Sequence, residues 1–389
     1  MIINRNITEH LKRMLTQFKV VSLTGPRQSG KTTLLRSEFS DYQYYNLERL
    51  DYREMILSDP MGFLKDKGVK IIFDEVQNVP DLFSYIQVFC DEKDETGQYI
   101  LSGSQSFLLN EHISQSLAGR VNINNLFPFD IIEIPGDTIN WHKLIVKGFY
   151  PVLYDKDISP NHFYPSYIQT YIDRDVRTLK NIGDLTAFSR FLKLCAGRVG
   201  QVLNLTSLAN DTGITVNTAK SWLSILQASY IIYLVQPYYR NFNKRLIKSP
   251  KLYFYDTGVI ASLLNIQHEN DVKTHYLYGA LFENLVISEF IKINYHNGKT
   301  PQIYYWRESN GTEIDCIIEQ PNNNLLAIEI KAGQTYNKDF IKNIKNFSKI
   351  AFQIKKVLIY GGEESMNLSD ITIISWIDFH KKIKDILNI

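Results

Sequence analysis

The stretch from Thr24 to Thr33 constrains this chain more than any other, because it fits the pattern G-x-x-x-x-G-K-[ST] without a mismatch. The apolar residues 20–23 before it predict a short buried strand, and residues 33–36 predict the first turns of a helix. A strand, a glycine-rich loop and a helix in that order aim backbone N–H groups and a positive helix end at a phosphate. The sequence therefore predicts a nucleotide site on a parallel α/β sheet with helices on both faces.

Within this loop, Lys31 is predicted to reach the outer phosphates, and Thr32 to hold Mg²⁺. The residues expected to surround the nucleotide are Gly25, Pro26, Arg27, Gln28, Ser29, Gly30, Lys31, Thr32 and Thr33.

Two later strands are predicted to complete the site. The apolar run 69–73 leads into Asp74 and Glu75. Asp74 is predicted to hold Mg²⁺ through water, and Glu75 to polarise the attacking water. The strand at 98–103 is followed by Ser104 and Gln105, either of which is placed to contact a γ-phosphate. A solvated loop after the first strand and an ordinary turn after the second are the alternatives.

Arg120 precedes a further strand, at 121–126, and is a candidate to act on the nucleotide of a neighbouring subunit. That role requires a homo-oligomer. A solvated surface arginine is the alternative.

A length of 389 residues predicts two or three domains, and 44% hydrophobic residues are enough for sizeable cores. The net charge of +2 argues against a chain coated with nucleic acid, but allows local basic patches. Three widely separated cysteines have no metal-ligand spacing, and no apolar run resembles a signal peptide or a membrane span. These features predict a cytoplasmic protein with no membrane association.

The motifs together resemble one large prokaryotic family of AAA+-type ATPases that carry a C-terminal domain of formerly unknown function. The resemblance covers most of the chain and implies ATP binding and a nuclease-like C-terminal fold. It rests on residues 25–32, 73–77, 101–104, 117–120, 150–151, 171–175, 256–258 and 329–331.

The middle of the chain has helix-turn-helix spacing: a short helix near Ala209, a turn at Gly213 and a second helix opening at Asn217. Two strands follow, at 231–235 and 251–255, and the loop between them is basic and aromatic, as in a winged helix. The module would contact DNA phosphates through Arg240, Lys244, Arg245 and Lys248, or would act as a lid on the ATPase. The charged run 173–175 is either a solvated face or a domain contact.

The last third predicts a helix with Glu283, a hairpin carrying Asp315, and a strand ending in Glu329-Ile330-Lys331. Residues i and i+2 of a strand face the same side, so Glu329 and Lys331 share one face, where Asp315 can meet them. Carboxylates in such a set suit Mg²⁺ or Mn²⁺, with Glu283 as a further ligand. Asp315, Glu329 and Lys331 resemble the core motif of the PD-(D/E)xK nuclease superfamily, although Ile314 stands where that motif usually has proline. The alternative is a solvated strand face with alternating charges.

We therefore expect an ATPase domain at 1–140, a helical and winged-helix module at 141–265, and a nuclease-like domain at 266–389. In the leading hypothesis, the ATP state controls a DNA-binding, metal-dependent nuclease domain. In the alternative, the chain is a nucleotide-dependent switch or scaffold whose nuclease-like domain is inactive and only binds DNA or protein. A sugar or nucleotide kinase is disfavoured, because no acceptor lid or base follows the loop.

Overall fold

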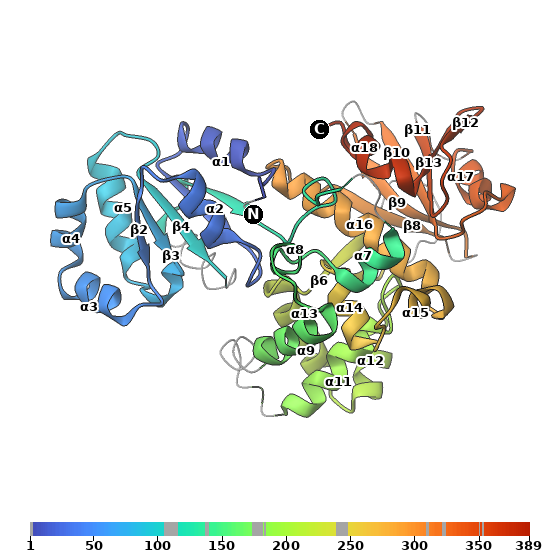
Figure 1. Cartoon of the computed structure of the whole chain (residues 1–389), viewed down its shortest axis with the longest axis horizontal. Coiled ribbons are helices and arrows are strands. Elements are labelled where there is room, and N and C mark those ends of the chain that lie inside the picture. Colours follow the sequence, from blue (N-terminus) through green and yellow to red (C-terminus); the bar gives the residue numbers. More distant parts are fainter. Residues whose placement is uncertain are drawn as a thin grey trace.

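A computed structural model describes residues 3–104, 116–136, 140–172, 182, 184–238, 248–308, 311–320, 324–349, 351 and 354–389 (Figure 1). Two sheets organise these residues, one near each end of the chain, with a largely helical segment between them. Across the same residues, none of the helices is both long and apolar enough to cross a bilayer. Gln105, Asp173, Arg174, Asp175, Arg240, Lys244 and Arg245 of the predictions above lie outside the described ranges.

The first sheet is entirely parallel, with the strand order β2-β3-β4-β1-β5. Strand β4 lies between β1, which leads into the glycine-rich loop, and β3, which ends at Asp74. The strands are β1 (Val20–Thr24), β2 (Gln43–Asn46), β3 (Ile71–Asp74), β4 (Tyr99–Gly103) and β5 (Val121–Asn125). The carboxyl ends of neighbouring parallel strands meet at one edge, which brings the predicted site residues together.

Helices cover this sheet on both faces, which explains why β1, β3 and β4 are buried along their whole length. One core joins Val21 and Leu23 to α1 and α2, and the other joins Val20 to α3, α4 and α5. The helices are α1 (Thr8–Leu15), α2 (Lys31–Glu38), α3 (Leu50–Ser58), α4 (Pro60–Lys67) and α5 (Leu82–Glu92).

The middle segment contains the expected pair of helices and the strands after them. Gly213 ends α12 with a positive φ of 80°, and Thr215 caps α13, accepting a hydrogen bond from the Thr218 N–H at 3.1 Å. The second helix therefore begins at Val216, one residue earlier than expected. The helices are α7 (Trp141–Lys147), α8 (Val152–Asp155), α9 (Pro160–Tyr171), α11 (Leu185–Ala196), α12 (Leu205–Thr212), α13 (Val216–Ala228), α14 (Thr257–Leu263) and α15 (Glu269–Thr274).

The hairpin after α13 is part of the second sheet. Its strands β6 (Ile232–Pro237) and β7 (Lys251–Phe254) pair antiparallel, and β6 also pairs in parallel with β8. The eight-stranded order is β12-β13-β11-β10-β9-β8-β6-β7. Its other strands are β8 (Ile303–Arg307), β9 (Glu313–Glu319), β10 (Leu325–Lys331), β11 (Ile354–Tyr360), β12 (Met366–Leu368) and β13 (Ile371–Ser375). The middle and C-terminal segments therefore share one sheet.

Helix α16 (Tyr278–His296) and helix α18 (Trp376–Leu387) pack on one face of this second sheet, and α17 (Lys342–Phe347) packs on the other. The alternation of β10 explains this, because Ile328 and Ile330 join the core with α16, while Ala327 joins the core with α17. Helix α16 is almost entirely buried and extends from the second sheet toward the first (Figure 1).

An aromatic cluster joins the two halves of the molecule. Phe127, just after β5, stacks on Tyr255 with ring centroids 4.4 Å apart, and meets Tyr230 edge-on at 5.4 Å. The Tyr230 hydroxyl lies 2.7 Å from Oγ1 of Thr24, the last residue of β1. The end of the strand that leads into the glycine-rich loop is therefore in direct contact with the middle segment.

Polar groups of α16 hold residues 127–133, the segment that follows β5. Glu289 accepts a hydrogen bond from the Ile131 N–H at 2.6 Å, and Lys292 donates one to the Phe129 carbonyl at 2.8 Å. His296 accepts a hydrogen bond from the Phe127 N–H at 3.2 Å. We call residues 127–133, with Glu289, Lys292 and His296, the junction.

We expect Phe127→Ala to lower the free energy of unfolding by about 3–5 kcal/mol, because it removes a fully buried ring at the centre of the aromatic cluster. Val88→Ala, on the exposed face of α5, is the control and should change it by about 0.5 kcal/mol or less. Urea unfolding followed by fluorescence measures both. A loss below about 1 kcal/mol for Phe127→Ala would contradict the described packing.

Burial raises the pKa of Glu289 to about 7 despite the nearby Lys292. The folded state then holds a proton that the unfolded state has lost, so this group's contribution to stability should fall as pH rises from about 4.5 past 7. In Glu289→Gln this fall should be absent. We expect the difference in thermal midpoint between wild type and the variant to shrink between pH 5 and 8, and a constant difference would contradict the assignment.

Candidate functional site

The glycine-rich loop closes tightly against the strand beside it. Gly25 has a φ of 153°, and a Cβ at this position would lie 2.0 Å from the Leu126 carbonyl oxygen, so only glycine fits. The Lys31 ammonium donates to the carbonyls of Gly25 and Pro26, both at 2.9 Å. The Lys31 side chain therefore lies against its own loop, where the phosphates of a nucleotide are predicted to bind.

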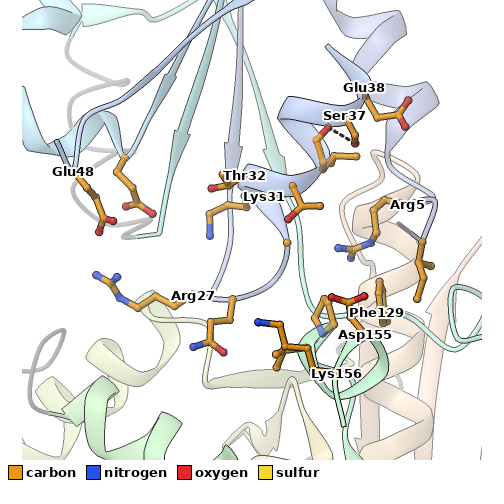
Figure 2. Close-up of a pocket in the computed structure, with 18 of the residues that line it drawn as sticks. Arg5, Arg27, Lys31, Thr32, Ser37, Glu38, Glu48, Phe129, Asp155 and Lys156 are labelled. Atoms are coloured by element: carbon orange, nitrogen blue, oxygen red, sulfur yellow. Dashed lines mark hydrogen bonds between the residues drawn. The ribbon is translucent and has the colours of Figure 1, made fainter. Parts of the chain in front are cut away.

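A cavity of about 800 Å³ opens beside this loop (Figure 2). One side of its wall comes from Arg27 and Gln28 of the loop, Thr33 of α2 and Glu75, which follows β3. Arg5, Phe129, Asp155 and Lys156 line the opposite side, and Figure 2 shows Arg5 and Lys156 on segments that face the loop. The cavity therefore lies between the first sheet and the segments around it, and sequence reasoning missed the contribution of Arg5, Phe129 and Lys156.

Thr32 and Asp74 form the expected pair for a metal. The Thr32 hydroxyl donates to Asp74 Oδ2 at 2.6 Å, and the Tyr44 hydroxyl donates to the same oxygen at 2.6 Å. The other oxygen, Oδ1, is buried with no hydrogen-bond partner in the described chain. A hydroxyl and an unsatisfied carboxylate oxygen are hard ligands, so this pair fits Mg²⁺. Tyr44 lies on β2 and was not predicted. Its pKa is raised by burial and by Asp74, which keeps it a donor.

Glu75 lies in an unusual backbone conformation beside the predicted sensor residue. Its φ of 55° is in the left-handed region, where a residue other than glycine is strained. Its Oε2 accepts hydrogen bonds from the Ser104 hydroxyl at 2.9 Å and from the Gln77 amide at 2.5 Å. The structure thus brings Ser104 to Glu75 at the carboxyl ends of β3 and β4. Gln77 was missed, although its place two residues after Glu75 in a tight turn was visible.

Arg120 lies just before β5, where its carbonyl accepts a hydrogen bond from the N–H of Val20. Val20 is the first residue of β1, and the glycine-rich loop follows the last. The Arg120 guanidinium forms two bonds with Asp91, at 2.6 and 2.8 Å. Within one chain, Arg120 is therefore on the far edge of the sheet from Lys31. A role on a neighbouring subunit's nucleotide stays a prediction.

In the second sheet, Asp315, Glu329 and Lys331 meet as predicted, and we call them the β10 triad. The Lys331 ammonium lies 2.8 Å from Asp315 Oδ2 and 2.5 Å from Glu329 Oε2. Burial and the Asp315 carboxylate raise the pKa of Glu329 to about 9. Burial opposes ionisation of Asp315 as well, but the charges of Lys331 and Lys251 outweigh it and hold its pKa below the ordinary value.

Among the described residues, no hydrogen bond or ion pair joins Glu283 to the β10 triad. Glu283 accepts hydrogen bonds from Lys251 at 2.9 Å and from the Tyr253 hydroxyl at 2.5 Å. Lys251, almost fully buried, also pairs with Glu313. Burial raises the pKa of Glu283, and the charge of Asp315 raises it further. The cluster around Glu283 and the β10 triad are therefore electrostatically coupled. Lys251 and Tyr253 were missed, although their i, i+2 spacing on a strand was a signal.

A third buried group, Asp130, Glu133 and His296, has the composition of a metal site. Each side chain is already engaged, however. His296 Nδ1 faces Asp130 at 2.8 Å, its Nε2 accepts from Phe127, and Glu133 accepts from Asn6 and Asp130 N–H groups at 2.7 and 3.0 Å. The group is therefore part of the junction.

Comparisons with known proteins divide the chain into three parts. Residues 17–134 match a family model described as an AAA domain, and residues 138–270 and 278–379 match two domains of unknown function, DUF8612 and DUF4143. The uncharacterised proteins Mb2031c of Mycobacterium bovis and Rv2008c of Mycobacterium tuberculosis are each 27% identical over 377 residues, which cover 96% of this chain and 83% of theirs.

Among solved structures, the Walker-type ATPase PABY2304 of Pyrococcus abyssi is similar over 68% of this chain and 96% of its own, at 14% identity and a TM-score of 0.44. Likeness at that level carries no weight for function. The AAA match carries more, because it includes the loop, Asp74 and Glu75 on one parallel sheet. Residues 17–134 thus match an AAA-type ATPase domain, and domains of this class bind ATP and usually Mg²⁺.

Proposed function

We propose that this chain hydrolyses ATP and that the state of its nucleotide controls a metal-dependent nuclease site on the second sheet. The observation that carries the proposal is helix α16, which bears Glu283 near one end and Glu289, Lys292 and His296 toward the other. The second group binds residues 127–133, and the first faces the charged cluster of the second sheet. At about 1.5 Å per residue, about 9 Å of helix separates Glu283 from Glu289, and about 20 Å separates it from His296.

At the ATP site, the oxygen of a water molecule would attack the γ-phosphorus, and the bond from that phosphorus to ADP would break. Glu75 would accept the proton of the water, Lys31 would stabilise the phosphate oxygens, and Ser104 would orient Glu75. Thr32 and Asp74 would hold Mg²⁺, which when bound neutralises charge on the β- and γ-phosphates.

In the second sheet, Asp315 and Glu329 would hold Mg²⁺ or Mn²⁺, which supplies Lewis-acid chemistry at a phosphodiester. Glu329 fits this role because, apart from its ion pair with Lys331, neither of its buried oxygens has a hydrogen-bond partner in the described chain. Lys331 would turn from the carboxylates to the scissile phosphate. Water would attack the phosphorus, one P–O ester bond would break, and the leaving hydroxyl would take up a proton.

A second function is favoured by the ion pairs themselves. Lys331 pairs with Asp315, Lys251 pairs with Glu283 and Glu313, and Arg307 also pairs with Glu313. Three cations therefore face three carboxylates, and the raised pKa of Glu329 keeps it neutral, so the cluster is compensated without a metal. Such a cluster suits a switch or scaffold whose nuclease-like domain only binds DNA or protein.

DNA as a partner is supported by the sequence of α12, α13 and the β6–β7 hairpin, the order found in winged helices. Of the four predicted phosphate contacts, only Lys248 lies within the described ranges, and it is exposed. The contact of Tyr230 with Thr24 supports the other role, a lid that responds to the ATPase. Oligomers would let Arg120 leave Asp91 and act on a neighbouring nucleotide.

For the ATPase, we expect Lys31→Ala to abolish binding of a fluorescent ATP analogue, because the loop loses its only ammonium. Glu75→Gln should keep binding but lower kcat at least 100-fold, since an amide cannot accept the proton of the water. Glu54→Gln, exposed on α3, is the matched control and should hydrolyse ATP at the wild-type rate. Wild-type rates in Glu75→Gln would contradict its assignment as the base.

For the second site, wild-type protein with ATP and Mn²⁺ should cleave linear, circular or single-stranded DNA. Asp315→Asn should lower cleavage at least 100-fold and weaken Mn²⁺ binding in calorimetry, whereas Asp339→Asn, an exposed change in the same part of the chain, should alter neither. If the wild type leaves every DNA form intact and Asp315→Asn binds Mn²⁺ equally well, the nuclease proposal fails and the switch is favoured.

A further inference from the structure

Arg5 is a buried arginine, before the first helix, that reaches the glycine-rich loop from outside the sheet. Only 7% of it is exposed. Its Nη1 donates to the Ser29 carbonyl and its Nη2 to the Phe127 carbonyl, both at 2.7 Å. Its Nε lies 3.1 Å from Glu133 Oε1, and its guanidinium lies over the Phe129 ring at 4.9 Å. One side chain therefore joins the loop to the junction.

The bond to Ser29 has a direct consequence for the phosphate site. In a trans peptide the carbonyl and the next N–H point in opposite directions, and the described chain has no cis peptide. Holding the Ser29 carbonyl on the Arg5 side therefore turns the Gly30 N–H away from Arg5. That N–H has no acceptor within the described chain, and the left-handed φ of 96° at Gly30 keeps it in place. Unpaired loop N–H groups are what a phosphate requires.

The surroundings of Arg5 argue against direct contact with the phosphates. Glu133, itself almost fully buried, neutralises the guanidinium charge through its ion pair, and both Nη atoms already donate to carbonyls. A lysine could not reproduce this arrangement, because its single ammonium cannot face three acceptors in a planar fork.

We infer that Arg5 is a positioning residue of the ATP site, which fixes the Ser29–Gly30 peptide and ties it to the segment held by α16. The inference rests on the proposed ATP function of the loop. It adds that loss of Arg5 weakens nucleotide binding in protein that remains folded, because the N–H donors of the loop are no longer fixed.

The test is titration of wild type and Arg5→Lys with methylanthraniloyl-ATP and Mg²⁺, at a temperature where circular dichroism shows both to be folded. We expect Kd to rise about tenfold and the KM for ATP to rise with it. A role in stability alone would reduce the fraction of active protein and leave Kd unchanged. Arg13→Lys, the same change at an exposed position of α1, should bind as wild type does.

If Arg5→Lys does not fold, Arg5→Gln replaces it, since the glutamine amide can keep one bond to the Ser29 carbonyl. A Kd within twofold of wild type in either folded variant would overturn the inference. Wild-type protein that binds the analogue but never hydrolyses ATP would instead contradict the proposed function, and the Kd comparison would still decide the role of Arg5.

Discussion

The structure depends on the hydrogen bonds between α16 and residues 127–133. The segment follows β5 directly, so it fixes where the ATPase sheet ends and how it meets the rest of the chain. Its backbone groups are buried and need partners, and Glu289, Lys292 and His296 supply them from one helix. Because an unpaired buried group is costly, the contact is expected to persist or to change as a unit.

Charge compensation is the second constraint. The chain buries many carboxylates, and nearly all lie against a cation or a backbone N–H: Glu133 against Arg5, Glu289 against Lys292, and Asp315 against Lys331. Asp74 and Glu329 differ, because each retains a buried oxygen, Oδ1 and Oε1 respectively, that has neither a hydrogen-bond partner nor an ion pair among the described residues. These two carboxylates are therefore where the structure best accommodates a bound cation.

Much of the ATP site was predictable from sequence, because the loop, Asp74-Glu75 and Ser104 lie at the ends of adjacent parallel strands, where local motifs and topology agree. The three members of the β10 triad were predictable for a similar reason, since strand spacing sets which side chains share a face. Arg5 and the junction were not, because their contacts join residues more than 20 positions apart and depend on how the two sheets meet. For the same reason, β6 and β7 were expected as a separate hairpin and instead extend the second sheet.

The central claim is that the ATP site and the second sheet communicate through α16. Hydrogen–deuterium exchange with and without a non-hydrolysable ATP analogue and Mg²⁺ tests it most directly. We predict changed exchange in residues 25–33, in residues 127–133 and along residues 278–296, because these segments are bonded in series. Changes confined to the first sheet, with residues 278–296 unaffected by a saturating analogue, would contradict the account.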